Sequence, residues 1–249
     1  MRLRRQRNLL LGVLLAVAAI CWLLVVRQAG MPPPMGPAMG MALPLFLLAW
    51  VAMMVAMMFP TAAPMILMFA TVSAGKRQRE EPFVPAWVFV SGYLAVWVGF
   101  GVLAFGTAIG IDALSRGSPW LMGNAARLGG LLLFLGGLYQ LSPLKNVCLA
   151  KCRSPLSFIL TSWRDGYAGA FAMGLKHGVY CLGCCWLLFA ILFPLGLMNI
   201  AAMVGLTLLI FAEKSLPFGL AIARVAGVAL TVYGGVVIVT SAGLPGMAI

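Results

Sequence analysis

The sequence GLKHGVYCLGCCW, residues 174–186, lies near the middle of an apolar segment that runs from Gly166 to Phe193. This short stretch holds the one histidine of the chain and three of its six cysteines. Of the 249 residues, 63% are hydrophobic and 9% are charged, and the mean hydropathy is +1.06. Because so few charges cannot keep a soluble domain dispersed, the composition predicts an integral membrane protein.

Seven apolar segments are candidate membrane spans, because about 20 apolar residues are needed to cross a hydrocarbon core of about 30 Å. The first follows the basic sequence MRLRRQR, as a signal peptide would, but it is long and lacks a small-residue cleavage site, so it is predicted to be retained. The sequence therefore predicts an all-α, polytopic transmembrane helical bundle and a single domain over residues 1–249. The segments are Leu9–Val26, Ala42–Val72, Val84–Ile109, Leu121–Leu141, Gly166–Phe193, Leu197–Ala212 and Phe218–Thr240.

Basic residues are distributed unevenly over the predicted loops. With the N-terminus inside and the C-terminus outside, twelve fall on the inner side and two, Arg27 and Arg116, on the outer side. Positive charge gathers on the cytoplasmic side, so this bias predicts the orientation in a bacterial inner membrane. Contact with anionic lipid then accounts for the net charge of +12, and no nucleic-acid partner is needed. The inner residues are Arg2, Arg4, Arg5, Arg7, Lys76, Arg77, Arg79, Lys145, Lys151, Arg153, Arg164 and Lys214.

On a helix, the histidine and cysteines of residues 174–186 share one face. His177, Cys181 and Cys185 are spaced i, i+4 and i+8, and Cys184 lies three residues after Cys181. Imidazole and thiolate suit soft metals, and a histidine at membrane depth is costly unless it has a partner or a function. The pattern predicts a site for Cu(I), with Zn(II) or another soft metal as the alternative. Packing is the other interpretation, for Cys184 or Cys185 in particular, because cysteine is often an inert buried residue.

A second pair, Cys148 and Cys152, is also spaced i, i+4. It falls in the inner segment Pro143–Trp163, where basic residues flank apolar ones and predict a short interfacial helix. Pro155 is expected to end or bend this helix. The pair forms either a second site, as in a relay, or part of the first site if the segment dips into the bilayer, and the sequence leaves both possibilities open.

Methionine is concentrated in one region, because ten of the sixteen methionines lie between Met31 and Met68. Thioethers hold Cu(I) and tolerate an oxidising exterior. The pattern predicts an outer loop that collects Cu(I) and a second span lined with sulfur, although gap-filling packing is the favoured interpretation of the span taken alone. The loop methionines are Met31, Met35, Met39 and Met41, and those of the span are Met53, Met54, Met57 and Met58.

Some residues have predicted structural roles. The segment around the cysteines is too long for one straight span, so it is expected to tilt, to begin in the headgroups, or to break at a glycine such as Gly174 or Gly183, which also permits close helix contact. Asp165 is a candidate N-cap for this helix. Glu213 and Lys214 are expected to mark the inner membrane boundary, with the lysine reaching toward the headgroups.

Four motifs together resemble a bacterial family of predicted metal-binding integral membrane proteins, some of whose members are described as copper chaperones. The motifs are WVAMMVAMMFPTAAP, LKNVCLAKCRSPLSF, HGVYCLGCCWLL and AEKSLPFG. The resemblance covers roughly Leu43 to Val239, which makes residues 42–240 the core. It implies ligands at His177 and at every cysteine named above, with the four methionines of the second span behind them.

Three functions compete on these observations. The first is Cu(I) handling by binding, transfer or insertion, with a metallochaperone or a metal-receiving membrane enzyme as partner. The second is a membrane thiol–disulfide electron carrier that uses Cys148–Cys152 and Cys181–Cys184 as exchanging pairs. The third is an assembly subunit of a larger membrane complex. Hydrolase chemistry is not expected, because the chain has five acidic residues and no paired carboxylates.

Overall fold

A computed structural model describes residues 2–30, 40–80 and 83–241, and in these ranges it contains helices and no strand. The all-α prediction is confirmed for this part of the chain. The helices are α1 (Arg2–Ala29), α2 (Leu43–Gln78), α3 (Ala86–Gly117), α4 (Pro119–Gly123), α5 (Ala125–Leu141), α6 (Pro143–Arg153), α7 (Pro155–Ser162), α8 (Gly166–Ala190), α9 (Leu192–Leu195), α10 (Ile200–Ser215) and α11 (Gly219–Thr240).

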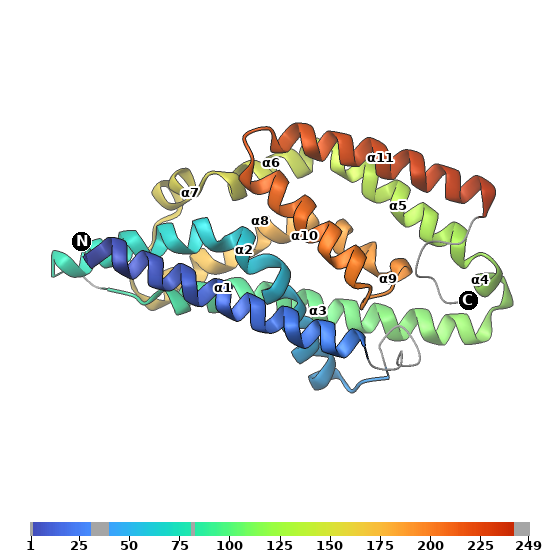
Figure 1. The fold of residues 1–249 in the computed structure, drawn as a ribbon, viewed down its shortest axis with the longest axis horizontal. Helices are drawn as coiled ribbons and strands as arrows, with labels where there is room; N and C mark the ends of the chain where they lie inside the picture. The colour runs from blue at the N-terminus through green and yellow to red at the C-terminus, as the bar shows by residue number, and fades with distance from the viewer. Residues whose placement is uncertain (1, 31–39, 81–82, 242–249) are drawn as a thin grey trace.

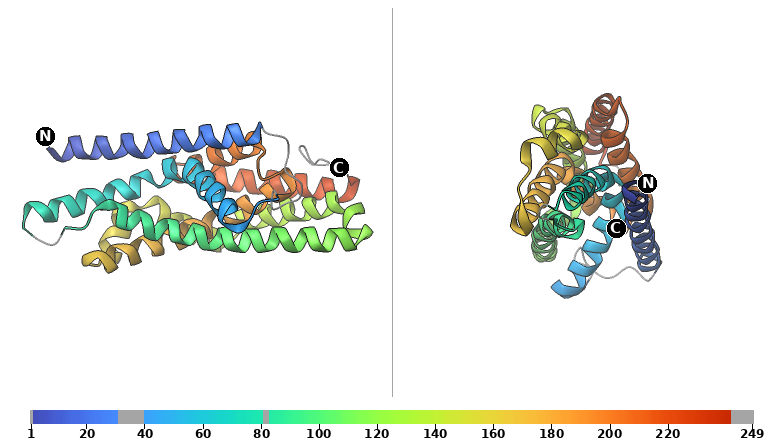
Figure 2. Two further views of the ribbon diagram at one scale, coloured as in Figure 1. Left: turned by 90° about the horizontal axis from the view of Figure 1, so that it is seen from below. Right: turned by 90° about the vertical axis from the view of Figure 1, so that its left-hand side faces the viewer.

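The long helices lie side by side along one axis of the molecule (Figures 1 and 2). The N-terminus and the end of α11 lie at opposite ends of this axis (Figure 1). Within the described ranges, five helical stretches are long and apolar enough to cross a membrane: α1, α2, α3, α8 with α9, and α11. The predicted count of seven spans is not confirmed, since α5 has 17 residues and α10 has 16. The predicted orientation is not confirmed either.

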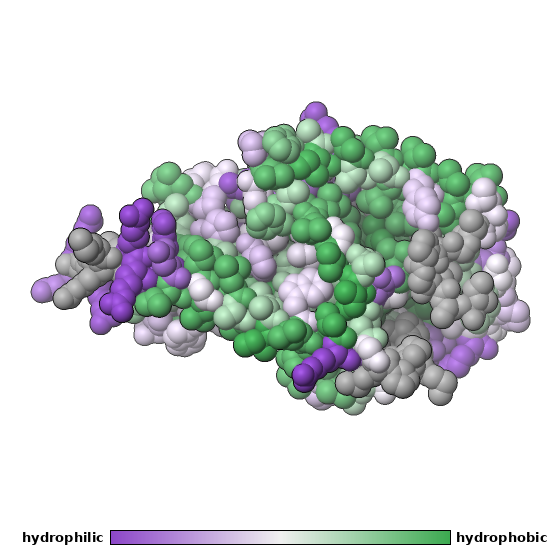
Figure 3. Space-filling view, in the orientation of Figure 1, coloured by the Kyte–Doolittle hydropathy of each residue, from purple (hydrophilic) through white to green (hydrophobic). Residues whose placement is uncertain are grey.

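The surface of the bundle is apolar along most of its length. Figure 3 shows hydrophobic residues over the middle and hydrophilic residues gathered at the end where α1 begins and α2 ends. Large apolar side chains point outward on several helices: Leu23 on α1 is 64% exposed, Leu103 on α3 is 68% exposed and Val239 on α11 is 82% exposed. Such a surface would cause association in water and is compatible with lipid, which supports the membrane assignment.

The predicted fourth span, Leu121–Leu141, is divided into two helices. α4 begins after Ser118, whose side chain accepts from the backbone N–H of Leu121, and α5 begins after Asn124. The amide of Asn124 donates to the carbonyl of Trp120 at 2.9 Å, so it ends the short helix. The apolar run therefore contains a helix boundary, because a polar side chain competes for the backbone hydrogen bonds.

α2 continues through two internal prolines. It bends in its middle (Figures 1 and 2), after the methionine-rich half and near Pro60 and Pro64. Each proline removes an N–H donor and pushes on the preceding turn, which is the ordinary cause of such a bend. Thr61 Oγ1 donates to the carbonyl of Met58 at 2.9 Å, so a side chain supplies part of the hydrogen bonding at this point.

α8 is continuous through its glycines, so the predicted break does not occur. A Cβ at Gly174 would overlap the backbone carbonyl of Phe89, and one at Gly183 would lie 2.8 Å from Cys148 Sγ. The glycines therefore serve the other predicted role, which is close contact with neighbouring helices. In lipid this close packing, rather than exclusion of water, holds helices together.

The segment 143–163 forms two helices, α6 and α7, separated at Ser154, with Pro155 as the first residue of α7. α6 is fastened to the end of α10. The guanidinium of Arg153 donates to the carbonyls of Glu213 at 3.2 Å, Leu216 at 2.6 Å and Pro217 at 3.0 Å. These contacts add donors to carbonyls at and just beyond the end of α10, and they hold α6 against this end.

Candidate functional site

Thiols from two helices meet inside the bundle. Cys181, Cys184 and Cys185 on α8 are at most 1% exposed. The thiol of Cys152, on α6, neighbours the thiols of Cys181 and Cys184 and interacts electrostatically with them. We call these four residues the thiol cluster. Cys148 lies beside it, with its sulfur against Gly183 and an electrostatic interaction with Cys184. The structure therefore places Cys148 and Cys152 of α6 beside the cysteines of α8, an arrangement that the sequence spacing alone left open.

The helical geometry of α8 orients two of these thiols. Cys184 Sγ donates to the carbonyl of Cys181 at 3.1 Å, and Cys185 Sγ donates to the same carbonyl at 2.7 Å. Side chains three and four positions apart lie on one face, so neighbouring residues can reach one acceptor. Cys184 and Cys185 therefore reach the same carbonyl although they are adjacent in sequence.

Cys181 has polar partners from two further helices. Tyr93 Oη on α3 lies 3.2 Å from Cys181 Sγ, and Lys214 Nζ on α10 donates to the same sulfur at 3.0 Å. The ammonium of Lys214 interacts electrostatically with all four members of the thiol cluster. The prediction that Lys214 reaches toward the headgroups was therefore wrong, because its side chain points at sulfur inside the bundle.

The residue before Lys214 forms a separate buried ion pair. Glu213 Oε2 lies 2.7 Å from Lys145 Nζ of α6, and the two side chains are 1% and 0% exposed. The amide of Gln140 on α5 donates to Glu213 Oε1 at 2.8 Å. Glu213 and Lys145 are therefore buried within the bundle, whereas the sequence predicts charges of the inner boundary and the inner loops at these positions.

His177 is buried among aromatic rings. It is 3% exposed, stacks on Tyr93 with centroids 5.5 Å apart and on Phe89 at 6.0 Å, and meets the edge of Phe158 at 5.6 Å. Neither ring nitrogen has a hydrogen-bond partner among the described residues. Cys181 is an electrostatic neighbour, so the ring lies next to the thiol cluster without being bonded to it.

A finished metal site is absent from the described ranges, where no three His, Cys, Asp or Glu side chains are arranged to hold one ion. Three of the thiols bond instead to other groups: Cys184 and Cys185 to a backbone carbonyl, and Cys181 to the polar groups of Tyr93 and Lys214. The donor chemistry still suits a soft ion, because it consists of thiols beside an imidazole whose nitrogens are unpaired. All six cysteines are free thiols.

The predicted methionine ligands divide into two groups. Met53, Met54, Met57 and Met58 are at most 1% exposed and belong to the same continuous core as the cysteines of α8. Their burial agrees equally with packing and with a sulfur-lined path. Met31, Met35 and Met39, which carry the prediction of a collecting loop, lie outside the described residues.

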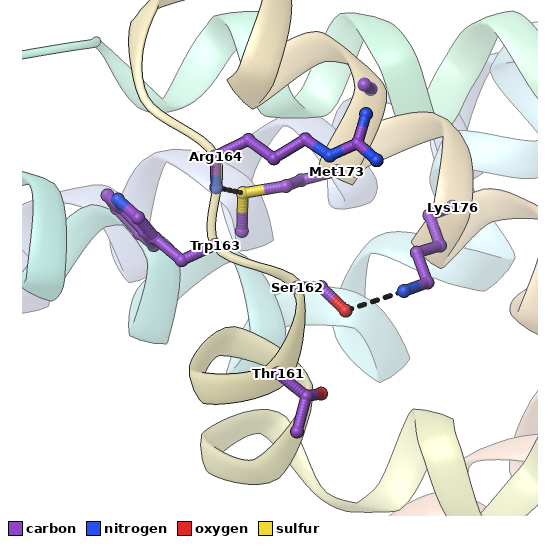
Figure 4. Close-up of a pocket in the computed structure, with 7 residues that line it drawn as sticks. Thr161, Ser162, Trp163, Arg164, Met173 and Lys176 are labelled. Atoms are coloured by element: carbon purple, nitrogen blue, oxygen red, sulfur yellow. Dashed lines mark hydrogen bonds between the residues drawn. The ribbon is translucent and has the colours of Figure 1, made fainter.

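A pocket of about 270 Å³ lies at the junction of α7 and α8, away from the thiol cluster. Figure 4 shows Lys176 pointing to Ser162, with Nζ 2.9 Å from Oγ, and the backbone N–H of Arg164 donating to Met173 Sδ at 3.4 Å. Lys176 follows Leu175 and precedes His177 in sequence, yet it is exposed and directed elsewhere. It therefore supplies no charge to the cluster.

The start of α8 is fixed by Asp165. The residue occupies the predicted N-cap position, but its carboxylate makes no capping bond and accepts instead from Lys76 and from Trp163 Nε1, the latter at 2.9 Å. The hydrogen bond from Lys76 lowers the pKa of Asp165 below its ordinary value. The contact joins the charged end of α2 to the start of α8.

Two functional candidates, Lys214 and Tyr93, are not identifiable from sequence spacing. The position of Lys214 after the glutamate of AEKS is the one sequence signal of a functional charge, because an ionisable group at the end of an apolar run needs a partner. Tyr93 gave no signal, since an aromatic residue in an apolar segment is ordinary.

The family model described as "PpoB2: Copper chaperone" matches residues 47–237. No curated protein and no solved structure matches the chain.

Proposed function

Because the chain belongs to the PpoB2 family of copper chaperones, we propose that it binds Cu(I) at the thiol cluster and passes it to an acceptor. The observation that carries the proposal is the meeting of Cys152 from α6 with Cys181 and Cys184 from α8. Thiolate is the protein ligand that best suits Cu(I). Two helices that each contribute sulfur to one buried point can enclose such an ion.

His177 is a secondary donor in this proposal. It precedes Cys181 by one helical turn, and its nitrogens have no hydrogen-bond partner in the part of the chain that the structure describes. An unpaired buried imidazole is costly, so a ligand that uses one nitrogen offsets this cost. Its aromatic neighbours hold the ring beside the cluster rather than in it.

The paths to and from the cluster are also proposed from chemistry. The buried methionines of α2 and the methionines of the outer loop would deliver the ion, because thioethers bind Cu(I) more weakly than thiolates. Cys148 and Cys152 on α6 would release it toward a metallochaperone or a metal-receiving enzyme. Both residues are only half-buried, which suits exchange between thiols. The setting is a bacterial inner membrane.

Metal content tests this proposal directly. The full-length protein is purified in detergent after growth with copper, and bound metal is measured by mass spectrometry. We expect copper in the wild type and in Cys21→Ser, because Cys21 lies on α1 and is half-buried outside the cluster. The variant Cys152→Ser/Cys181→Ser/Cys184→Ser should lose it. Equal copper in this variant and the wild type would reject the site.

A thiol–disulfide carrier is the second candidate, because Cys152 and Cys181 are neighbouring thiols from different helices. In that function a disulfide between α6 and α8 would form when electrons pass to an acceptor. Acid quenching of cells followed by alkylation distinguishes the two candidates. Persistent oxidation of this pair in growing cells favours electron transfer, and reduced thiols with bound copper favour metal handling.

A further inference from the structure

The ammonium group of Lys214 lies beside the thiol cluster and has no carboxylate partner there. Lys214 Nζ lies 3.0 Å from Cys181 Sγ and interacts with the other three thiols. Glu213 precedes it in sequence, but that carboxylate is already held by Lys145 at 2.7 Å and by Gln140 at 2.8 Å. The neighbouring acid therefore does not neutralise Lys214.

The other acidic residues within the described ranges are also committed or distant. Asp112 pairs with Arg116 at 2.9 Å, and Asp165 pairs with Lys76. Glu80 is exposed in the turn after α2. Among the described carboxylates, none is placed to balance Lys214, so the natural counter-charge of this ammonium is thiolate.

The hydrogen bonds indicate which thiols become ligands first. Cys184 and Cys185 each donate to the carbonyl of Cys181, so each keeps its proton in this arrangement. Cys181 Sγ receives the ammonium instead, and Cys152 reaches it from the other helix. Cys152 and Cys181 are therefore the pair that can lose protons to a metal ion without breaking the bonds within α8.

From these observations, and resting on the proposed function, we infer that Lys214 makes the site selective for a monovalent soft cation bound by Cys152 and Cys181. Cu(I) with two thiolates carries one negative charge, and the ammonium of Lys214 brings the total to zero. Zn(II) with the same pair is neutral, and the ammonium then leaves one positive charge. An uncompensated charge inside an apolar bundle is strongly disfavoured, so the fixed cation favours the monovalent ion.

This charge balance predicts opposite effects on two metals. In Lys214→Met the Cu(I) complex keeps an unbalanced negative charge, and the Zn(II) complex becomes balanced. We expect the Cu(I) affinity to fall by about tenfold or more and the Zn(II) affinity to rise by about tenfold. A purely structural lysine could not produce this result, because damage to the site weakens both metals together.

The affinities are measured on full-length protein in detergent, by competition with a chromophoric chelator for Cu(I) and a fluorescent chelator for Zn(II). Lys214→Arg keeps the charge and should retain the wild-type preference. Lys176→Met is the matched control, because that lysine lies on α8 and contacts Ser162 rather than sulfur. It should leave both affinities unchanged. If Lys214→Met does not fold, Lys214→Gln tests the same loss of charge with a polar side chain.

The outcomes separate the two proposals. A wild type that binds no Cu(I) overturns the proposed function and this inference together. A wild type that binds Cu(I), with a Lys214→Met variant whose preference between the metals is unchanged, overturns the inference alone. Parallel weakening of both metals also overturns it, whereas opposite shifts restored by Lys214→Arg support it.

Discussion

Lys145 on α6 and Glu213 on α10 form a buried ion pair, with Nζ 2.7 Å from Oε2 and side chains 0% and 1% exposed. The pair fixes the helix that carries Cys148 and Cys152 against the helix that carries Lys214. It therefore positions the second source of sulfur, although it contacts none of the four thiols of the cluster.

Removing one charge of this pair should lower the free energy of unfolding strongly, whereas removing both charges should lower it little. Lys145→Met or Glu213→Gln alone leaves one charge buried without a partner, so each should destabilise the protein by about 3 kcal/mol. Lys145→Met/Glu213→Gln should recover most of this loss. Reversible unfolding in mixed micelles measures the three free energies. Additive losses in the double variant would show that the residues do not act as a pair.

Close packing of α3 against α8 should depend on Gly174. A side chain there would overlap the carbonyl of Phe89, so Gly174→Ala should separate the helices and destabilise the bundle by about 1–3 kcal/mol. Gly106→Ala is the control, because nothing lies within 4 Å of a Cβ at that position of α3. Thermal unfolding compares the two. An unaffected Gly174→Ala variant would contradict the packing described here.

His177 should tolerate an aromatic replacement better than a small one. His177→Phe removes two unpaired nitrogens from an aromatic site and should leave the melting temperature unchanged or raised, while His177→Ala opens a cavity and costs about 2–4 kcal/mol. If the imidazole is a secondary donor, His177→Phe should also weaken Cu(I) binding by about tenfold. A folded variant with wild-type Cu(I) affinity would remove His177 from the site.

The contact of Asp165 with Lys76 should appear as a small pH-dependent stability. The ammonium lowers the carboxyl pKa, so the contact stabilises the folded state above the ordinary carboxyl pKa of about 4 and is lost as the pH falls through the lowered value. Asp165→Asn should therefore melt slightly below the wild type at neutral pH, and the difference should vanish in acid. The effect is small because the carboxylate is 63% exposed. A constant difference at all pH values would contradict it.

The helical content and the shared face of the cysteines of α8 could be predicted from the sequence, because both depend on local patterns. The apolar segments gave the long helices α1, α2, α3, α8 and α11, and helical spacing placed Cys181, Cys184 and Cys185 on one face. The structural roles of the prolines and glycines were harder to predict, because the sequence alone is compatible with a helix break and with close contact between helices. Neighbouring helices decide between them, as they do at Gly174.

Long-range partners could not be predicted. Spacing within α6 and α8 cannot reveal that Cys152 lies beside Cys181, because that contact depends on how the two helices dock. The same limit made Glu213 and Lys214 look like boundary charges. An ionisable residue at the end of an apolar segment is interpreted as a contact with lipid headgroups unless its charged or thiol partner on another helix is known.

The measurement that tests the Cu(I) site most directly is copper X-ray absorption of the anaerobically loaded, full-length protein. The site proposed here predicts a Cu(I) edge and a first shell dominated by sulfur, with both the sulfur shell and the bound copper lost in Cys152→Ser/Cys181→Ser. A first shell of nitrogen and oxygen, or an unchanged spectrum in that variant, would contradict binding of Cu(I) by thiols of α6 and α8.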